Sequence, residues 1–235
     1  ISYNGYMSAD LEESISFQSE RTRMVKDQIR QRGIANRAVL DAFLKIPRHR
    51  FVAQQYQGEA YSDHPLPLGF GQTISQPYIV ALMTELAGLH GGEQVLEIGT
   101  GSGYQAAILS CLCRQVDTIE RVPDLARQAQ QILEELRIMN VRVHTGDGTL
   151  GYPLAAPYDV ILVTAGAPRV PLPLKHQLKK NGKLILPVGD RWVQELQVLT
   201  LKAGDFSSAS IIPVVFVPLL GEYGREEKPQ ARDQI

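Results

Sequence analysis

The chain has 235 residues, a formal net charge of −1, 44% hydrophobic residues and 21% charged residues, a composition that suits an ordinary globular protein with a sizeable core. A near-neutral charge without a basic stripe argues against binding to nucleic acid through the phosphate backbone. No apolar run approaches the roughly 20 residues of a membrane span, and we find no signal peptide, so we expect a cytoplasmic protein without a membrane partner.

The first part of the chain predicts two helices and a long connection. Residues 1–18 show no periodicity, and we interpret them as a mobile arm. The stretch 19–32 carries an apolar stripe, and Ser19 at its start is a candidate N-cap. Asn36 is placed to cap a second helix, which must stop before Pro47. Residues 53–71 are rich in Pro, Gly and aromatic side chains, and a connection this long usually has a function.

Helical and apolar strand patterns then alternate along the chain. The expected helices cover residues 78–87, 104–113, 123–137 and 172–180, and the expected strands cover 95–98, 116–119, 141–144, 159–164 and 183–187. This alternation predicts a doubly wound, mostly parallel sheet with helices on both faces. Residues 194–202 and 208–217 flank a turn and predict a C-terminal antiparallel hairpin. We therefore predict an α/β fold with an N-terminal helical cap.

The most informative stretch carries three glycines at alternate positions, Gly99, Gly101 and Gly103, between an apolar run and a helical pattern. Such a turn lets a ligand approach the backbone, and the amides that open the helix point at that ligand. A dinucleotide-binding loop needs glycine at the sixth position of G-x-G-x-x-G, where this chain has Tyr104. An acid, Glu97, lies two residues before the first glycine.

A second acid lies at the end of the next predicted strand. Glu120 follows Glu97 by 23 residues and closes the apolar stretch 115–120. An acid at about this offset accepts hydrogen bonds from ribose hydroxyls in nucleotide-binding folds of this type. The alternative is an ordinary solvated glutamate at a strand end. Together with the glycine loop, we favour the ribose contact.

The E-x-G-x-G-x-G form of this loop resembles motif I of class I S-adenosylmethionine methyltransferases. The resemblance implies a Rossmann-like fold, and it implies that the acid beside the loop faces the ammonium group of the cofactor, directly or through water. The cofactor-binding residues that it implies are Glu97, Gly99, Thr100, Gly101, Ser102 and Gly103, with Glu120 on the ribose.

Further stretches share one resemblance. They are Gly71-Gln72-Thr73-Ile74-Ser75-Gln76-Pro77, Gly146-Asp147-Gly148, Phe216-Val217-Pro218-Leu219 and Ile46-Pro47-Arg48. With motif I they resemble the protein-L-isoaspartate (D-aspartate) O-methyltransferases of bacterial type, over roughly residues 20 to 222. Motif I alone indicates a methyltransferase, and the stretch 73–77 narrows the interpretation to this family.

The resemblance implies methyl transfer from S-adenosyl-L-methionine to the free α-carboxylate of L-isoaspartyl and D-aspartyl residues, with S-adenosyl-L-homocysteine as the product. The methyl ester then closes to a succinimide, whose hydrolysis returns some normal aspartyl linkage, so the enzyme initiates repair. The implied partners are isoaspartyl-containing proteins and peptides. We expect the enzyme to be a monomer.

The resemblance assigns Ser75 to the active site, with Thr73 as a helper. A carboxylate has a reference pKa near 4, so the substrate is already a nucleophile at neutral pH and needs no base. Hydroxyl donors that position it suffice. The alternative, from the residues alone, is that Ser75 caps the helix that follows it.

Asp147 resembles the residue that contacts the adenine end of the cofactor, with Gly148 beside it; an ordinary Asp-Gly turn is the alternative. One departure concerns Val215, which stands where the bacterial family usually carries Arg, so a substrate contact from this position is in doubt. The five histidines show no ligand spacing, and Cys111 and Cys113 fit neither a disulfide nor a metal site. We expect no metal, and two reduced thiols.

We expect one methyltransferase domain over residues 19–235. Its parts are a cap and substrate loop at 19–90, a cofactor-binding core at 91–190, and C-terminal strands and tail at 191–235. The nearest alternative is a class I methyltransferase that acts on another carboxylate or on a small molecule. An NAD-dependent oxidoreductase is disfavoured by Tyr104, and the Ser75 loop argues against a non-catalytic cofactor-binding module.

Overall fold

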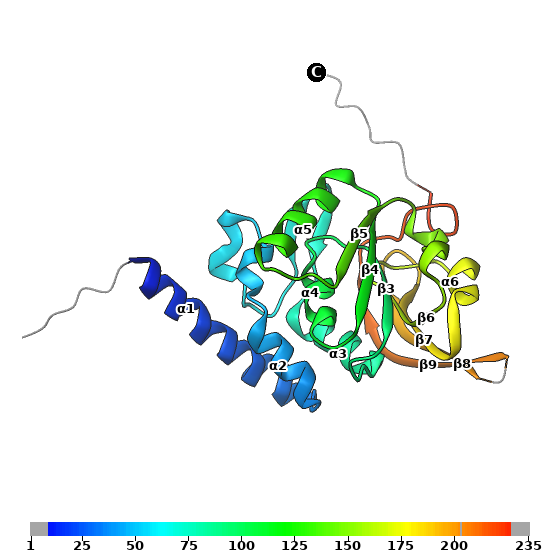
Figure 1. Ribbon diagram of the computed structural model, residues 1–235, viewed down its shortest axis with the longest axis horizontal. Coiled ribbons are helices and arrows are strands. Elements are labelled where there is room, and N and C mark those ends of the chain that lie inside the picture. The colour runs from blue at the N-terminus through cyan, green and yellow to red at the C-terminus, as the bar shows by residue number, and fades with distance from the viewer. Residues whose placement is uncertain (1–8, 203, 227–235) are drawn as a thin grey trace, which may run out of the picture.

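Seven strands form one central sheet in the computed structural model, which describes residues 9–202 and 204–226 (Figure 1). They are β3 (Gln94–Ile98), β4 (Gln115–Glu120), β5 (Val141–Thr145), β6 (Tyr158–Val163), β7 (Leu178–Gly189), β8 (Gln194–Lys202) and β9 (Asp205–Val214). Their order in the sheet is β5-β4-β3-β6-β7-β8-β9. The strands from β5 to β7 run parallel, and β8 and β9 add antiparallel. The predicted fold class is confirmed.

Helices cover both faces of the sheet (Figure 1). One face carries α3 (Pro77–Ala87), α4 (Tyr104–Ser110) and α5 (Pro123–Glu135), and the other carries α6 (Leu172–His176). Because successive residues of a strand point to opposite faces, Val95 packs into one core and Leu96 into the other, and both are fully buried. Burial on both faces explains the continuous apolar strands of the sequence.

The N-terminal helix begins earlier than the sequence predicts. Helix α1 (Ala9–Arg23) continues through a π-helical turn, Met24–Ile29, and a 3-10 turn, Arg30–Arg32, before Gly33 ends it with a φ of +100°. Ser19 therefore lies inside the helix, and its prediction as the N-cap is wrong. The expected arm falls partly in this helix, and residues 1–8 lie outside the described residues. The division of the chain into parts stays a prediction.

Helix α2 (Arg37–Lys45) begins as predicted. The Asn36 side chain accepts hydrogen bonds from the backbone amides of Ala38 and Val39, at 2.9 and 3.4 Å. These bonds satisfy two of the amides that a helix start leaves unpaired. Four further 3-10 helices complete the helical segments: Arg48–Phe51, Gln54–Glu59, Gly148–Leu150 and Pro153–Ala155.

The long connection before α3 contains a hairpin that the sequence pattern does not show. Strands β1 (Leu66–Gly69) and β2 (Gln72–Ile74) pair antiparallel. Two prolines and two glycines lie in the stretch 65–71, and these residues mask a strand signal that is only three or four residues long. The hairpin places residues 73–76 directly before α3, which begins at Pro77 as Pro at a first helical position predicts.

The C-terminal half differs from expectation in its boundaries. Helix α6 stops at His176, because Leu178 already pairs with Tyr158 and starts β7. The predicted antiparallel hairpin is present as β8 and β9, but β9 spans Asp205–Val214. The chain then leaves the sheet, and the Gly166 amide donates to the Val217 carbonyl at 2.7 Å. This extended segment, residues 215–220, lies beside the loop that follows β6.

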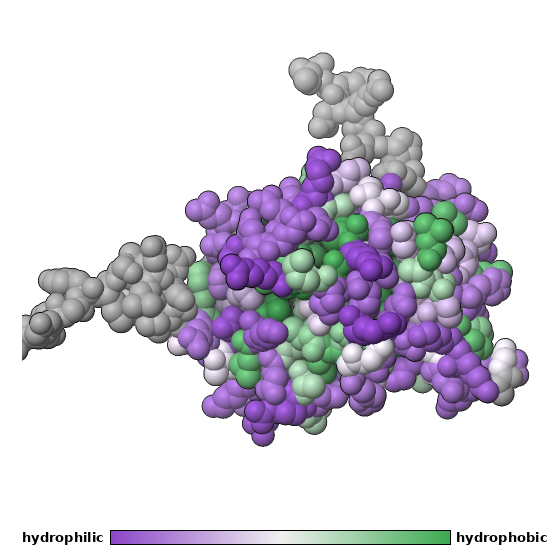
Figure 2. Space-filling view, viewed as in Figure 1, coloured by the Kyte–Doolittle hydropathy of each residue, from purple (hydrophilic) through white to green (hydrophobic). Residues whose placement is uncertain are grey.

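The face of the molecule in Figure 2 is mostly hydrophilic, with hydrophobic residues in separate small groups. Within the described residues, no helix has both the length and the hydropathy that crossing a bilayer requires. Cys111 and Cys113 are free thiols, half-buried and buried respectively. Burial raises the pKa of both thiols, which favours their protonated, less reactive form.

Candidate active site

Three adjoining cavities lie at the carboxyl ends of β3 and β6. The chain progresses across the sheet in opposite directions from these two neighbouring strands, so the loops that follow them diverge and leave a crevice. We name an inner cavity of about 70 Å³ beside Gly99, Glu120 and Gly148, a junction cavity of about 40 Å³ beside Thr100 and Gln105, and an outer cavity of about 670 Å³ beside Gln76, Val193 and Phe216. Thr73 and Thr164 line all three, which are therefore parts of one depression.

The glycine loop forms the floor of the inner cavity. Gly99, Gly101 and Gly103 all have positive φ, at +97°, +52° and +85°, a region that other residues enter at a cost. A Cβ on Gly99 would lie 2.5 Å from the Thr164 hydroxyl oxygen, so this position has no room for a side chain. That hydroxyl donates to the Gly99 carbonyl at 2.7 Å and joins the loop after β3 to the end of β6.

Glu120 ends β4 beside the same loop. One carboxylate oxygen accepts from the Gly101 amide at 2.9 Å and the other from the Val122 amide at 3.0 Å. The residue is 5% exposed and lines the inner cavity. Each carboxylate oxygen can accept more than one hydrogen bond, so Glu120 retains capacity for a ligand hydroxyl, and the ribose contact stays a prediction.

Glu97 lies beneath the loop and is completely buried. Its carboxylate accepts from the Thr118 hydroxyl at 2.5 Å, and this hydroxyl lies 2.7 Å from that of Thr100. Burial raises the pKa of the Glu97 carboxyl to about 8. The linings of the three cavities come from the loop residues above it. Glu97 therefore supports the loop from inside the sheet, and its predicted link to the cofactor has to pass through the hydroxyl chain.

Asp147 fastens the C-terminal segment over the site. One of its carboxylate oxygens accepts from the Thr149 amide and hydroxyl at 2.8 and 2.7 Å, and the other accepts from the Glu222 amide at 2.8 Å. Gly148 lines the inner cavity, and a Cβ there would lie 2.5 Å from an Ile98 methyl group. The structure thus gives Asp147 three partners of its own, and its adenine contact stays a prediction.

Thr73 and Ser75 lie where the cavities meet. Ser75 lines the junction and outer cavities, and Thr73 lines these two and the inner one. Helix α3 takes Gln76 as its N-cap residue and has no side-chain cap bond. The alternative that Ser75 serves as a helix cap is therefore wrong. The Ser75 hydroxyl is therefore available to a ligand in the junction and outer cavities.

Two residues that matter to this arrangement were not predicted as part of the site. Arg48 is fully buried, and its guanidinium donates to the carbonyls of Ala60 and Ser75 at 2.7 and 2.9 Å. It also lies 4.9 Å above the ring of Tyr104, the first residue of α4. Burial lowers the pKa of Arg48 to about 10, which leaves it charged at neutral pH. Gln194 is the second. Its side chain donates to the Asp190 carbonyl and accepts from the amide of the distant Phe216, a contact that leaves no local signal in the sequence.

The comparisons with known proteins agree with this geometry. A sequence profile of the protein-L-isoaspartate(D-aspartate) O-methyltransferase family (PCMT) matches residues 19–224. The chain is 52% identical over 212 residues to protein-L-isoaspartate O-methyltransferase 1 of Syntrophobacter fumaroxidans, covering 90% of this chain and 99% of that relative. It is 53% identical over 207 residues to the protein-L-isoaspartate O-methyltransferase of Methanoregula boonei, with coverages of 88% and 95%.

Two solved structures are similar over most of the chain. A protein-L-isoaspartate O-methyltransferase superposes with a TM-score of 0.79 at 32% identity, covering 87% of this chain and 67% of that one. A Plasmodium falciparum protein described as a beta-aspartate methyltransferase, in complex with S-adenosyl-L-homocysteine, superposes with a TM-score of 0.74 at 25% identity, with coverages of 87% and 98%. The chain belongs to the protein-L-isoaspartate(D-aspartate) O-methyltransferase family.

Proposed function

We infer that the chain is an S-adenosylmethionine-dependent protein-L-isoaspartate O-methyltransferase, which methylates the free α-carboxylate of L-isoaspartyl and D-aspartyl residues in damaged proteins and peptides. Family membership supports this function, as do relatives of that name at about 50% identity. The ester closes to a succinimide, and repair begins there. A monomeric, cytoplasmic enzyme that binds neither nucleic acid nor membrane stays our prediction.

The inner and junction cavities fit this cofactor in their chemistry. When bound, S-adenosylmethionine supplies a methyl group on a positively charged sulfur. We propose that Glu120 accepts from its ribose hydroxyls and that the side-chain-free Gly99 and Gly101 let its amino-acid end approach the backbone. Gly148 leaves space at the adenine end, beside Asp147. The complex of the Plasmodium falciparum protein with S-adenosyl-L-homocysteine supports the choice of cofactor.

One observation carries the assignment of the transfer point. Thr73 and Ser75 lie where the cavities that contain the glycine loop meet the larger outer cavity. A substrate carboxylate in the outer cavity therefore reaches the cofactor beside these two hydroxyls and that of Thr164, which already donates to the Gly99 carbonyl. We propose that both donate to the carboxylate and hold one of its oxygens in line with the methyl group, at the approach of about 3–3.5 Å that such reactions require.

The remaining chemistry needs little from the protein. The carboxylate is ionised at neutral pH, so no residue has to remove a proton. The linings of the junction and outer cavities hold hydroxyls, the side-chain amides of Gln76 and Gln105, and apolar groups, and no histidine or charged side chain of the described residues. Neutral donors orient the nucleophile without the strong pairing that a cation would impose on it. What this site contributes is alignment and exclusion of water.

Replacement of Ser75 tests the assignment. We expect Ser75→Ala to slow methylation of an isoaspartyl peptide roughly tenfold, because one donor to the carboxylate is lost. Ser75→Asp should be nearly inactive, since it sets a second negative charge against the substrate in a partly dry site. Both variants should bind the cofactor and melt almost as the wild type does, because Ser75 caps no helix.

The assay uses paired isoaspartyl and aspartyl peptides of the same sequence, and it measures methyl transfer, cofactor affinity by calorimetry and the melting temperature. Methylation of the isoaspartyl member alone supports the proposed activity. An Asp variant that methylates as fast as the wild type would sink the role of Ser75, and equal methylation of both peptides by the wild type would sink the substrate assignment.

A further inference from the structure

The outer cavity is larger than a carboxylate needs, and its two ends differ. Its volume of about 670 Å³ lies in the range of whole ligand sites. Where it adjoins the other two cavities it carries the hydroxyls of Thr73, Ser75 and Thr164, the proposed point of methyl transfer. The rest of the lining carries Val193, Val215 and their apolar neighbours beside Gln76, with no charged side chain among the described residues.

Val193 and Val215, which we call the apolar rim, are unusually open to solvent. Val193 is 55% exposed and Val215 is 75% exposed. They come from different segments, Val193 from the turn between β7 and β8 and Val215 from the chain just after β9. Two exposed valines on the mouth of a ligand cavity leave apolar surface that a bound partner can cover.

Hydrogen bonds of the Asp190 and Gln194 side chains fix the position of the apolar rim. The Asp190 side chain accepts from the Val193 amide at 2.8 Å and fixes the turn. The Gln194 side chain, in a residue that is 2% exposed, donates to the Asp190 carbonyl and accepts from the Phe216 amide, each at 2.7 Å. One buried amide therefore ties the turn that carries Val193 to the segment that carries Val215. A surface fixed in this way loses little entropy when it binds.

We propose that the apolar rim selects isoaspartyl residues whose neighbour in the substrate chain has an apolar side chain. This inference rests on the proposed function, which places the isoaspartyl carboxylate at the polar end of the same cavity. The residues next to it then lie over Val193 and Val215. An apolar neighbour removes both valines from water. A charged neighbour would lose water there without gaining an ionic partner.

The test compares kcat/KM for isoaspartyl peptides that differ only in the residue before or after the isoaspartyl position, with Val, Ser, Asp or Lys there. For the wild type we expect Val to exceed Asp and Lys by roughly 5- to 20-fold on at least one side. The double variant Val193→Ser/Val215→Ser should bring this ratio close to one. Val215→Arg should make Asp the favoured neighbour.

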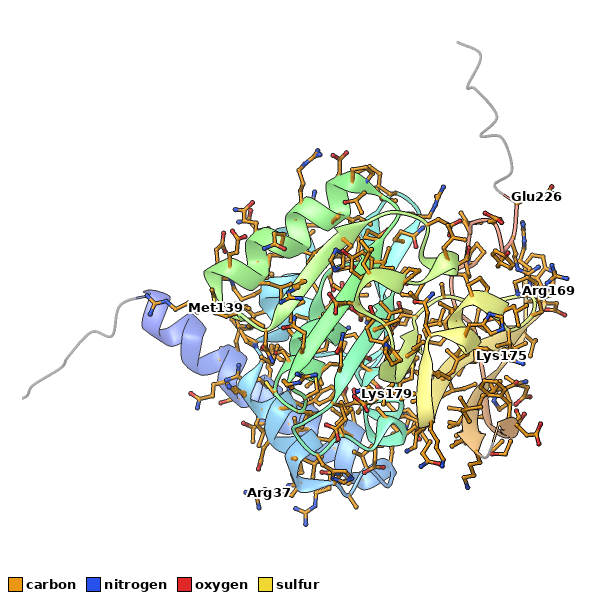
Figure 3. All side chains as sticks on the ribbon, turned by 45° about the vertical axis from the view of Figure 1, so that its right-hand side comes forward. Arg37, Met139, Arg169, Lys175, Lys179 and Glu226 are labelled. Carbon is orange, nitrogen blue, oxygen red and sulfur yellow. The ribbon has the colours of Figure 1, made fainter. Side chains whose placement is uncertain are left out.

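Met139→Ser is the matched control. Met139 is 85% exposed, lies just before β5 at the opposite edge of the sheet, and is far from β8 and β9 in Figure 3. The control should keep the wild-type preference. Equal kcat/KM for Val and Asp peptides in the wild type, or an unchanged ratio in the double variant, overturns the inference and leaves the methyltransferase function standing. If no isoaspartyl peptide is methylated at all, the proposed function and the inference both fail.

Discussion

The cofactor side and the substrate side of this site are built in different ways. The cofactor side uses backbone: three glycines with positive φ, and a carboxylate that accepts from the amide of the middle one. Its residues lie at or just after the carboxyl ends of the neighbouring strands β3, β4 and β5. The substrate side uses side chains from four separate places, residues 65–79, 164, 193 and 213–217, which meet only through folding.

This difference indicates which part of the enzyme is free to vary. A backbone cradle tolerates little change, because all three glycines have a positive φ and Gly99 also lacks space for a Cβ. The outer cavity presents exposed valines on a fixed frame, and an exposed residue can change without disturbing packing. Constant chemistry at one side and adjustable substrate preference at the other follow from these two modes of construction.

The largest expected effect is on the cofactor side. Gly99→Ala places a methyl group 2.5 Å from the Thr164 hydroxyl at a φ of +97°. Strain in the left-handed region alone costs roughly 1–2 kcal/mol, and with the clash we expect cofactor affinity to fall by more than about 100-fold. Calorimetry with S-adenosylmethionine measures this loss. Gly58→Ala is the control, because its Cβ meets nothing within 4 Å, and equal affinities for the two variants would contradict the backbone cradle.

A smaller loss is expected at Glu120. Glu120→Ala removes an ionised acceptor and its bond to the Gly101 amide, so we expect the cofactor to bind roughly 10- to 100-fold more weakly. Glu120→Gln keeps one acceptor oxygen and should lose less. At saturating cofactor, KM for the isoaspartyl peptide should stay near the wild-type value, since Glu120 lines the inner cavity only. A mutant that binds S-adenosylmethionine normally contradicts the ribose contact.

The same contrast explains which parts of the structure could be predicted from the sequence. The strand–glycine–helix signal at 95–105 and the acid Glu120 are local patterns, and the structure has both as predicted. The hairpin β1–β2, the role of Gln194 and the extended segment after Val214 depend on contacts between residues far apart in the chain. The prediction of Ser19 as the N-cap failed because the helix begins at Ala9, ten residues before Ser19, in a stretch without an apolar stripe.

Arg48 connects the two sides, and its replacement tests how closely they are coupled. Its guanidinium holds the Ser75 carbonyl and lies over the Tyr104 ring at the end of the glycine loop. We expect Arg48→Lys and Arg48→Met to lower kcat/KM for the peptide roughly tenfold through displacement of Ser75, with a smaller change in cofactor affinity. Because a buried arginine also affects folding, the decisive measurement is a double-mutant cycle with Ser75→Ala. If Arg48 acts by positioning Ser75, the second substitution costs less in the first background, whereas fully additive losses exclude that role.

The smallest effect on cofactor affinity is expected at Glu97, and it separates a supporting acid from a ligand-binding one. The pKa of its carboxyl is raised from 4.5 to about 8 by burial, so the folded protein keeps a proton that the unfolded chain releases. The contribution of Glu97 to stability is therefore fully present below pH 4.5 and is lost as the pH rises toward 8, by up to about 1.4 kcal/mol per pH unit. Glu97→Gln, which cannot ionise, should gain stability relative to the wild type between pH 5 and 8 in urea unfolding, while Glu134→Gln on the exposed face of α5 should not.

Cofactor affinity decides the rest. An acid that only supports the loop can become an amide with little loss of binding, because the Thr118 hydroxyl still finds an acceptor. An acid that attracts the ammonium group through Thr118 and Thr100 cannot, so a loss of tenfold or more in Glu97→Gln would give Glu97 the cofactor role that its motif implies.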